Sequence, residues 1–371
     1  MTKIIKKIFM VLGISIAFLI IFLILKRDNI SNNIIETRGV VLEVDNEDVI
    51  NSSVSSIGVQ TLKVKIKGNS YFNKEVLVRN NLLGKKELDT IAKVGDKIIF
   101  ALNCDGNKIC EGVLIEKDRL GSMLLLFYFF TLVLIIYAGI TGLRTLGSFI
   151  IVLIILWKVL LPNLLAGVNP LFITMIVIIL LTGIIIFSVS GINKRGMVAC
   201  IASCLGTLIT FFLTQFFGDL MSLSGFTAPY AETLIMNGLF NLDIQGLFNS
   251  AIVIGASGAS MDIAMDLSAS LYEIKQKKPN IEKKELIASG LEIGKAVVGT
   301  MTTTLLLAYS GTFLTLLLLF MYKETSILHL LNLKIVAGEI MRTIVGSIGL
   351  IIVAPLTAYL GAYFFLKDKK I

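Results

Sequence analysis

The stretch PLFITMIVIILLTGIIIFSV, at residues 170–189, contains no charged side chain. A helix needs about 20 apolar residues to cross the hydrocarbon core of a bilayer, so this stretch predicts a membrane-spanning helix. The composition of the whole chain agrees, because 55% of its 371 residues are hydrophobic and only 16% are charged. Soluble domains carry about 25% charged residues. We therefore predict a polytopic protein that lies in a lipid bilayer.

Further apolar stretches lie on both sides of this one. In the C-terminal part of the chain, residues 120–371, they predict helices at 122–141, 145–161, 170–189, 197–217, 246–270, 294–320 and 338–365. An eighth helix is predicted near the N-terminus, at residues 9–25. The expected fold is an α-helical membrane protein with a bundle of seven helices and one separate N-terminal helix.

The N-terminal stretch fits either a signal peptide or a membrane anchor, since Lys3, Lys6 and Lys7 precede it. A signal peptide ends in a small-x-small cleavage site and has an apolar core of about 7 to 15 residues. No such site follows the apolar run, and the run at 9–25 is longer than that core. We favour an uncleaved anchor at residues 1–27.

The positions of lysine and arginine predict the orientation of the chain. Cytoplasmic loops of membrane proteins are enriched in these residues. They are frequent in the segments 191–196 and 275–284 and in the C-terminal tail, whereas the predicted outer loops hold only Lys323 and Lys334. We therefore expect both termini on the cytoplasmic side of a cell membrane.

Residues 28–119 have a different pattern, because short segments of alternating polarity, such as 61–66 and 97–102, are separated by Asn, Asp, Ser and Gly. Period-two alternation predicts strands. We expect a small β-rich, OB-like barrel on the extracytoplasmic side, because closing a sheet removes its exposed edges. On that side Cys104 and Cys110 could form a disulfide, and two ordinary half-buried thiols fit the spacing equally well.

Several classes of function are disfavoured. The charge of +8 comes from short segments beside apolar runs, so we expect no nucleic-acid partner. Four cysteines and the single His329 give little scope for a metal or haem site, and we expect no cofactor. Neither His-Glu-x-x-His nor a Gly-x-Ser-x-Gly elbow in a suitable context is present, so we expect no enzyme. The chain also has no ATP-binding Gly-x-x-x-x-Gly-Lys-Ser/Thr loop.

Two carboxylates lie within the predicted helix 246–270. Asp262 and Asp266 are four residues apart and therefore share one helix face, which Gly255 and Gly258 extend. Acids inside the membrane cost roughly 2.5 to 3.5 kcal/mol on insertion scales and normally face the bundle interior or water. One interpretation is a cation or proton site. The alternative is a packed helix whose acids pair with Lys or Arg or are solvated at the cytoplasmic end.

A hydroxyl-rich segment follows in the next predicted helix. Thr300, Thr303 and Tyr309 could replace water around a solute or form hydrogen bonds between helices. Hydroxyl groups in helices also bond to the backbone of their own helix, and this alternative stays open. Gly299, at the start of the segment, is expected to serve helix packing or hinge motion.

A third polar cluster begins the last helix. Glu339 and Arg342 are spaced for an ion pair within the helix, although Arg342 could instead pair with one of the acids of the helix 246–270. Gly346 and Gly349 are expected at a helix-packing surface. Pro355 predicts a kink further along the same helix.

Three sequence blocks occur in a specific order. They read Gly-Ala-x-Gly-Ala-x-Met-Asp-x-Ala from Gly255, Gly299-Thr-Met with Thr304-Leu-x-Leu-Ala-Tyr, and Glu339-Ile-x-Arg with Val345-Gly-Ser-Ile-Gly-Leu and Pro355-Leu-Thr. In these blocks the chain resembles the YibE/F-like family of bacterial multi-pass membrane proteins, over about residues 120–366. Asp266 departs from the pattern, because a small or hydroxyl residue is expected there in relatives. The resemblance implies membership and architecture rather than a substrate.

Two hypotheses from different classes follow. In the first, the protein is a secondary transporter or permease component in which Asp262, with Asp266 and the threonines of the following helix, binds an ion or small solute. In the second, it is a non-transporting assembly or sensory protein that binds a partner through its outward domain. A second membrane protein or a second copy of the chain is a candidate partner in either case.

Overall fold

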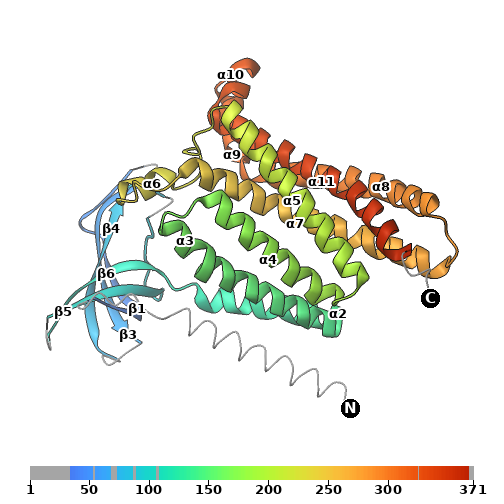
Figure 1. The fold of residues 1–371 in the computed structure, drawn as a ribbon. Helices are drawn as coiled ribbons and strands as arrows, with labels where there is room; N and C mark the ends of the chain where they lie inside the picture. The colour runs from blue at the N-terminus through green and yellow to red at the C-terminus, as the bar shows by residue number, and fades with distance from the viewer. Residues whose placement is uncertain are drawn as a thin grey trace, which may run out of the picture. The chain divides into compact units, whose positions relative to one another are not determined.

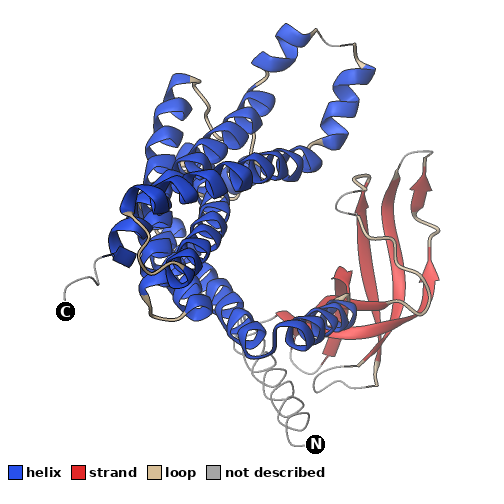
Figure 2. Cartoon of the chain, turned by 90° about the vertical axis from the view of Figure 1, so that its right-hand side faces the viewer, coloured by secondary structure: helices blue, strands red, loops and turns tan. Residues whose placement is uncertain are grey.

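A computed structural model describes residues 34–52, 55–67, 73–86, 89–105, 108–324 and 326–366. The predicted anchor at 1–27 lies outside these residues. The chain divides into two compact units, Met1–Tyr137 and Ala138–Ile371. The first unit holds all the strands of the described chain, and the second holds most of the helices (Figure 2).

The first unit contains a closed β-barrel. Its strands are β1 Ile34–Asp45, β2 Val49–Asn51, β3 Ser56–Ile66, β4 Glu75–Leu83, β5 Lys97–Asp105 and β6 Lys108–Lys117. They pair in the order β1-β5-β6-β4-β3-β2, and β1 also pairs with β3, which closes five of the strands into a barrel. The β4–β6 pair is parallel and all other pairs are antiparallel. The alternating segments of the sequence therefore form a small barrel-like domain.

The barrel interior follows from the alternation of side chains along the strands. In β4 every second residue is buried, and Leu62 of β3 and Ile98 and Phe100 of β5 are completely buried. Glycine is needed where two strands approach closely. A Cβ atom at Gly39 would lie 2.4 Å from Cγ1 of Val64. The residue types thus fix both the inward face and the closure of the sheet.

Two buried amides connect the barrel wall to the segment before β5. The side chain of Gln60 donates to the carbonyl of Ala92 and accepts from its N–H group, at 3.1 and 3.0 Å. Asn80 donates to Oε1 of Gln60 at 3.0 Å and to the carbonyl of Thr90 at 2.7 Å. Buried polar groups stabilise a fold only when they are hydrogen-bonded, and these bonds hold the irregular segment 89–93 against the barrel.

The helices of the described chain are long and apolar. Their bounds are α2 Leu120–Ile155, η1 Leu156–Leu160, α3 Leu161–Leu165, α4 Pro170–Ser190, α5 Lys194–Leu220, α6 Ala231–Met236, α7 Ile244–Lys277, α8 Lys283–Thr312, α9 Leu314–Tyr322, α10 Ile327–Asn332 and α11 Lys334–Leu366. Six helical spans in the described residues are long and apolar enough to cross a membrane. They are Leu120–Leu165, Pro170–Ser190, Lys194–Leu220, Ile244–Lys277, Lys283–Gly311 and Lys334–Leu366.

The predicted count of eight membrane helices is not confirmed. The helices predicted at 122–141 and 145–161 belong to the single span Leu120–Leu165 of 46 residues, and Arg144 lies inside it. A helix of that length measures about 69 Å, more than twice the roughly 30 Å of a hydrocarbon core. The backbone departs from helical geometry at Gly139, with φ 55° and ψ −122°, a conformation that glycine permits. The chain therefore breaks earlier than predicted.

The helix predicted at 294–320 also differs from the structure. The observed helix α8 begins at Lys283 and ends at Thr312, and the separate helix α9 follows after Phe313. At three other helices a capping side chain marks the first turn. Asn169, Asn193 and Asp243 each accept a hydrogen bond from the backbone N–H group three residues later, at the first turns of α4, α5 and α7.

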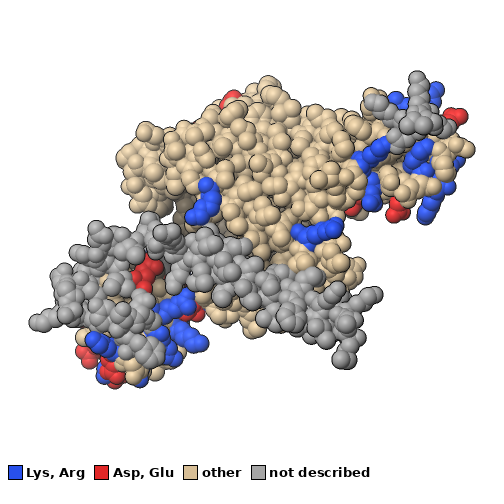
Figure 3. All heavy atoms as spheres, turned by 60° about the horizontal axis from the view of Figure 1, so that its bottom comes forward, with Lys and Arg blue, Asp and Glu red and all other residues tan. Residues whose placement is uncertain are grey.

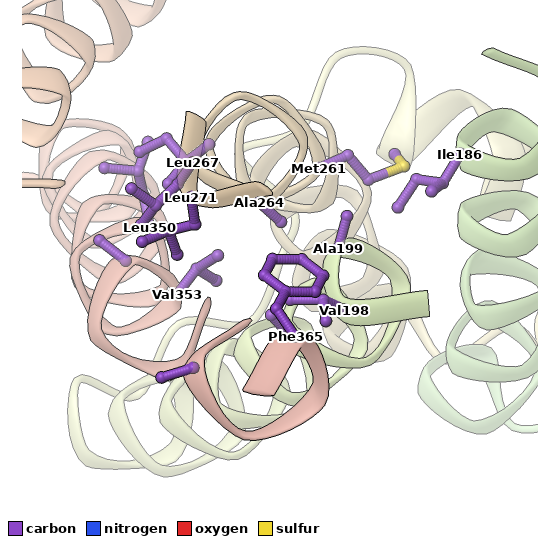
Figure 4. Packing of buried hydrophobic residues seen from close by; sticks show 14 of the residues in the cluster. Ile186, Val198, Ala199, Met261, Ala264, Leu267, Leu271, Leu350, Val353 and Phe365 are labelled. Carbon is purple, nitrogen blue, oxygen red and sulfur yellow. The ribbon is translucent and has the colours of Figure 1, made fainter. Parts of the chain in front are cut away.

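The core of the second unit lies among α4, α5, α7 and α11, which run alongside one another (Figure 1). Figure 4 shows Ala264, Leu267 and Leu271 of α7 near Val353 of α11. Small residues permit close approach of the helices. A Cβ atom at Gly349 of α11 would lie 1.9 Å from the hydroxyl of Thr210 on α5. The helix α8 packs mainly against α11 and leaves much of its surface exposed.

Candidate functional site

The ion pair of α11 is formed between Glu339 and Arg342. Nη1 of Arg342 lies 3.4 Å from Oε1 of Glu339, and the side chains are only 23% and 18% exposed, respectively. The guanidinium group of Arg342 also lies 5.6 Å from the ring centroid of Phe248 on α7, a cation–π contact. Of the partners that the sequence left open for Arg342, the structure thus selects Glu339.

Each partner of this ion pair also has a buried polar atom that forms no hydrogen bond within the described residues. Oε2 of Glu339 and Nε of Arg342 are both buried, and neither has a hydrogen-bond partner among the described residues. Burying a polar atom without a partner costs free energy, and the cost is larger for a charged group. The carboxylate of Glu339 therefore has one oxygen available to a hydrogen-bond donor or a cation.

Glu339 lines a cavity of about 310 Å³ among α8, α9 and α11, whose places in the bundle are shown in Figure 1. Its polar lining residues are Tyr309, Ser310, Glu339 and Thr343. The remaining lining is apolar and consists of Leu306, Phe313, Leu316, Leu317, Ile335, Val336, Ile340 and Ile344. A mostly apolar cavity with few polar groups is typical of a small-molecule site.

Tyr309 links this cavity to the glycine face of α7. A Cβ atom at Gly255 would lie only 2.9 Å from the hydroxyl oxygen of Tyr309. A side chain at that position would therefore require Tyr309 to move. The structure thus brings together four predicted site residues around one region: Tyr309, Glu339 and Arg342, with Gly255 behind the tyrosine.

Asp262 and Asp266 lie apart from this region. Both are exposed on α7, whereas the neighbouring residues Met261, Ile263 and Ala264 are buried in the core. Among the described residues, neither carboxylate forms an ion pair or accepts a hydrogen bond, and neither lines the cavity of Glu339. The helix thus turns its apolar face into the bundle and its acids outward.

Thr300 and Thr303 are exposed on α8. Their hydroxyl groups donate to the backbone carbonyls of Val297 and Gly299, at 2.9 and 3.3 Å. Both are thus bonded to their own helix, although each oxygen can still accept a hydrogen bond. Of the hydroxyls on this helix, Thr302 has its oxygen buried without a partner in the described chain.

The remaining predicted positions have distinct surroundings. A Cβ atom at Gly258 or Gly299 would meet no atom within 4 Å, whereas at Gly346 it would lie 3.6 Å from Cβ of Ala256. Pro355 lies inside α11, which continues beyond it. The side chains of Cys104 and Cys110 lie outside the described residues, so their predicted bridge is not addressed.

Other polar groups near this region were missed from the sequence. Asn249 of α7 is 1% exposed, and neither its oxygen nor its nitrogen has a partner among the described residues. It lies one position after Phe248, which contacts Arg342. Thr343 lines the cavity one residue beyond that arginine. An amide within an apolar helix is a signal that would have identified Asn249.

The six long apolar helical spans of the described residues place the protein in the class of polytopic helical membrane proteins. A family model described as YibE/F-like protein matches residues 126–367, most of the chain. The protein therefore belongs to the YibE/F-like family, as the three sequence blocks indicated. Searches of curated proteins and of solved structures found no match.

Proposed function

We propose that this YibE/F-like protein is a permease for a small solute, and that the cavity at Glu339 is its binding site on the outer side of the membrane. The observation that supports this function is that Glu339, whose Oε2 atom is buried without a partner among the described residues, lines a mostly apolar cavity. A solute that carries one cationic or hydrogen-bond-donating group on a small apolar body would satisfy that oxygen. The ion pair with Arg342 would fix the carboxylate in place.

The orientation proposed for the chain rests on its charge distribution. Figure 3 shows Lys and Arg gathered at the end of the helical part where α7 is followed by α8, with few charged residues over its middle on that face. By the positive-inside rule this end is cytoplasmic. The N-terminal anchor and a crossing on each side of Gly139 would then give eight helices in a bacterial cell membrane, with both termini cytoplasmic. The strand order, with its one parallel pair, supports an OB-like fold for the barrel, and the same orientation of the chain would place this domain outside the cytoplasm.

Asp262 and Asp266 are proposed as a coupling site for a cation or a proton. Both belong to a membrane helix and lack a protein partner among the described residues, so water or a bound cation would have to solvate them. Transport driven by an ion gradient fits a chain that has no ATP-binding loop. This role is separable from that of Glu339, because the acids do not line the same cavity.

The exposed surface of α8 supports self-association. This helix is the least buried of the six spans, and its exposed residues include Glu292, Lys295, Thr300 and Thr303. Lipid tails solvate such groups poorly, so a protein surface is the expected neighbour. Because the surface carries charges of both signs, we propose a second copy of the chain as the partner.

A thermal-stability screen of the purified protein against ions and small amines tests the solute site. A ligand that binds only the folded state raises the unfolding temperature. We expect at least one compound to do so in the wild type and to lose its effect in Glu339→Gln. The matched control is Glu324→Gln, which neutralises an exposed carboxylate after α9. A compound whose effect survives in Glu339→Gln would exclude this cavity as its site.

A second function is favoured by one feature of the barrel. Ile50, Ile57 and Leu83 are exposed neighbours, since Ile57 pairs with both of the others across β2 and β4. An exposed apolar patch is typical of a protein-binding surface. A sensory or assembly protein would use this patch to hold a partner. Changing Ile57 to Ser would then abolish its activity in cells and leave ligand binding at Glu339 unchanged.

A further inference from the structure

A second cavity lies among the start of α5, the end of α7 and the end of α11. Its volume is about 830 Å³. It is lined by Asn193, Lys194, Arg195, Tyr272, Lys275, Gln276, Pro279, Asn280, Phe365 and Leu366. Three of these residues are basic and none is acidic, so the cavity has a positive potential. It is separate from the cavity at Glu339, with which it shares no lining residue.

Two of the basic groups, those of Arg195 and Lys275, are held by neutral contacts. The guanidinium group of Arg195 lies 5.0 Å from the ring centroid of Tyr272, and its backbone carbonyl accepts a hydrogen bond from the hydroxyl of Ser268 at 2.9 Å. Nζ of Lys275 donates to the carbonyl of Pro279. Neither Arg195 nor Lys275 forms an ion pair with any described carboxylate. Their charges are thus positioned but not neutralised.

Two further features favour an anion. The N-terminus of α5, capped by Asn193, lies at the cavity, and helix N-termini carry a partial positive charge. The amide side chains of Gln276 and Asn280 add hydrogen-bond donors. Phe365 and Leu366 supply an apolar wall next to these groups. The cavity can therefore accept a group that is anionic at one end and apolar at the other.

We propose that this cavity binds a phosphate group, and that its source is the headgroup of an anionic phospholipid in the cytoplasmic leaflet. Arginine and lysine are the usual protein partners of phosphate. Basic pockets between membrane helices on the cytoplasmic side suit anionic headgroups. The apolar wall favours a lipid over a soluble phosphate, because an acyl chain can cover it. The proposal does not depend on the permease function.

The experiment measures thermal unfolding of the full-length protein in neutral detergent with added phosphatidylglycerol, phosphatidylcholine or inorganic phosphate. We expect phosphatidylglycerol to raise the unfolding temperature and phosphatidylcholine to leave it unchanged. In the variant Arg195→Gln with Lys275→Gln, the concentration of phosphatidylglycerol that gives half of the shift should rise at least tenfold. Lys277→Gln with Lys278→Gln removes the same charge from α7 and its end, outside the cavity, and should keep the wild-type response.

Each outcome decides the proposal. A shift by inorganic phosphate that the cavity variant abolishes supports the phosphate site and assigns a soluble source. A shift by phosphatidylglycerol that is equal in the wild type and the cavity variant overturns the proposal, as does the absence of any shift. If the double variant does not fold, the single variant Lys275→Gln is used, with an expected weakening of at least threefold.

Discussion

On α11, Nη1 of Arg342 lies 3.4 Å from Oε1 of Glu339, while the second carboxylate oxygen of Glu339 is buried without a partner among the described residues. The pair is therefore both a structural contact and an incomplete one. The contact predicts an effect on stability, and the unpartnered oxygen predicts an effect on ligand binding.

Removal of the arginine leaves the acid unpaired in the bundle. We predict that Arg342→Gln lowers the free energy of unfolding by about 3 kcal/mol, because a buried charge without its partner is strongly destabilising. The loss of unfolding free energy in the double variant, Arg342→Gln with Glu339→Gln, should be smaller than the sum of the losses in the two single variants. Unfolding in mixed micelles measures all three values, with Lys334→Gln at the exposed start of the same helix as control. Additive effects would show that the two residues do not interact.

Glycine positions of the bundle should respond unequally to the same substitution. Gly349→Ala would bring its Cβ within 1.9 Å of the Thr210 hydroxyl, so we predict a loss of about 1 to 3 kcal/mol in unfolding free energy. Thr210→Ala should recover part of that loss. Gly299→Ala meets no atom within 4 Å and should be neutral or stabilising by up to about 1 kcal/mol. Equal effects at both glycines would contradict the packing of α5 on α11.

The barrel should lose stability in acid. The side chain of Lys117, 2.7 Å from Oδ2 of Asp96, lowers the pKa of Asp96, and the hydroxyl of Thr90 donates to Glu116 at 2.6 Å and lowers the pKa of Glu116. A carboxylate with a lowered pKa stabilises the fold above its unfolded pKa, and this contribution disappears as the pH falls through the folded pKa. The loss of stability should therefore begin near pH 4, at about the ordinary pKa values of these carboxyl groups, and continue at lower pH.

Hydrogen exchange of peptides from β5 in the full-length protein measures this effect, after correction for the intrinsic exchange rate at each pH. The double variant Asp96→Asn with Glu116→Gln should be less stable than the wild type at pH 7, and its stability should depend less on pH. A variant with the acid sensitivity of the wild type would show that other groups control the transition.

The exposed surface of α8 predicts contact between two copies of the chain. In a background without the four native cysteines, Thr303→Cys should form a disulfide-linked dimer in membranes after mild oxidation. Phe212→Cys, on an exposed position of α5, is the matched control and should stay monomeric. If Thr303→Cys is cross-linked only to other proteins, the partner of α8 is a different protein and the proposed contact between two copies is wrong.

Local patterns accounted for much of the fold. The alternation at 61–66 predicts β3 because Leu62, Val64 and Ile66 point into the barrel, and the charge-free run at 170–189 predicts α4 nearly to its ends. The break at Gly139 could not be predicted, since membrane helices contain many glycines and only the backbone selects the one that adopts φ 55°. Likewise, no sequence feature marks the interruption at Phe313.

The candidate site was predictable in part. The spacing of Glu339 and Arg342 predicts their ion pair because residues three apart in a helix are neighbours. The cavity could not be predicted, since it requires α8 and α11 to converge across the segment that contains α9 and α10. The sequence left open whether Asp262 faces the bundle interior or water, and in the structure it lies on the exposed face of α7. Its buried neighbours Ile263 and Ala264 determine which face of α7 packs, and this leaves the acid outward.

Flux into proteoliposomes tests the permease proposal most directly, with the compound that stabilises the wild-type protein as the solute. We predict uptake above that of protein-free vesicles for the wild type and for Glu324→Gln, and at least a tenfold lower initial rate for Glu339→Gln. Wild-type uptake no faster than that of protein-free vesicles, or equal rates in Glu339→Gln and the wild type, would contradict the proposal.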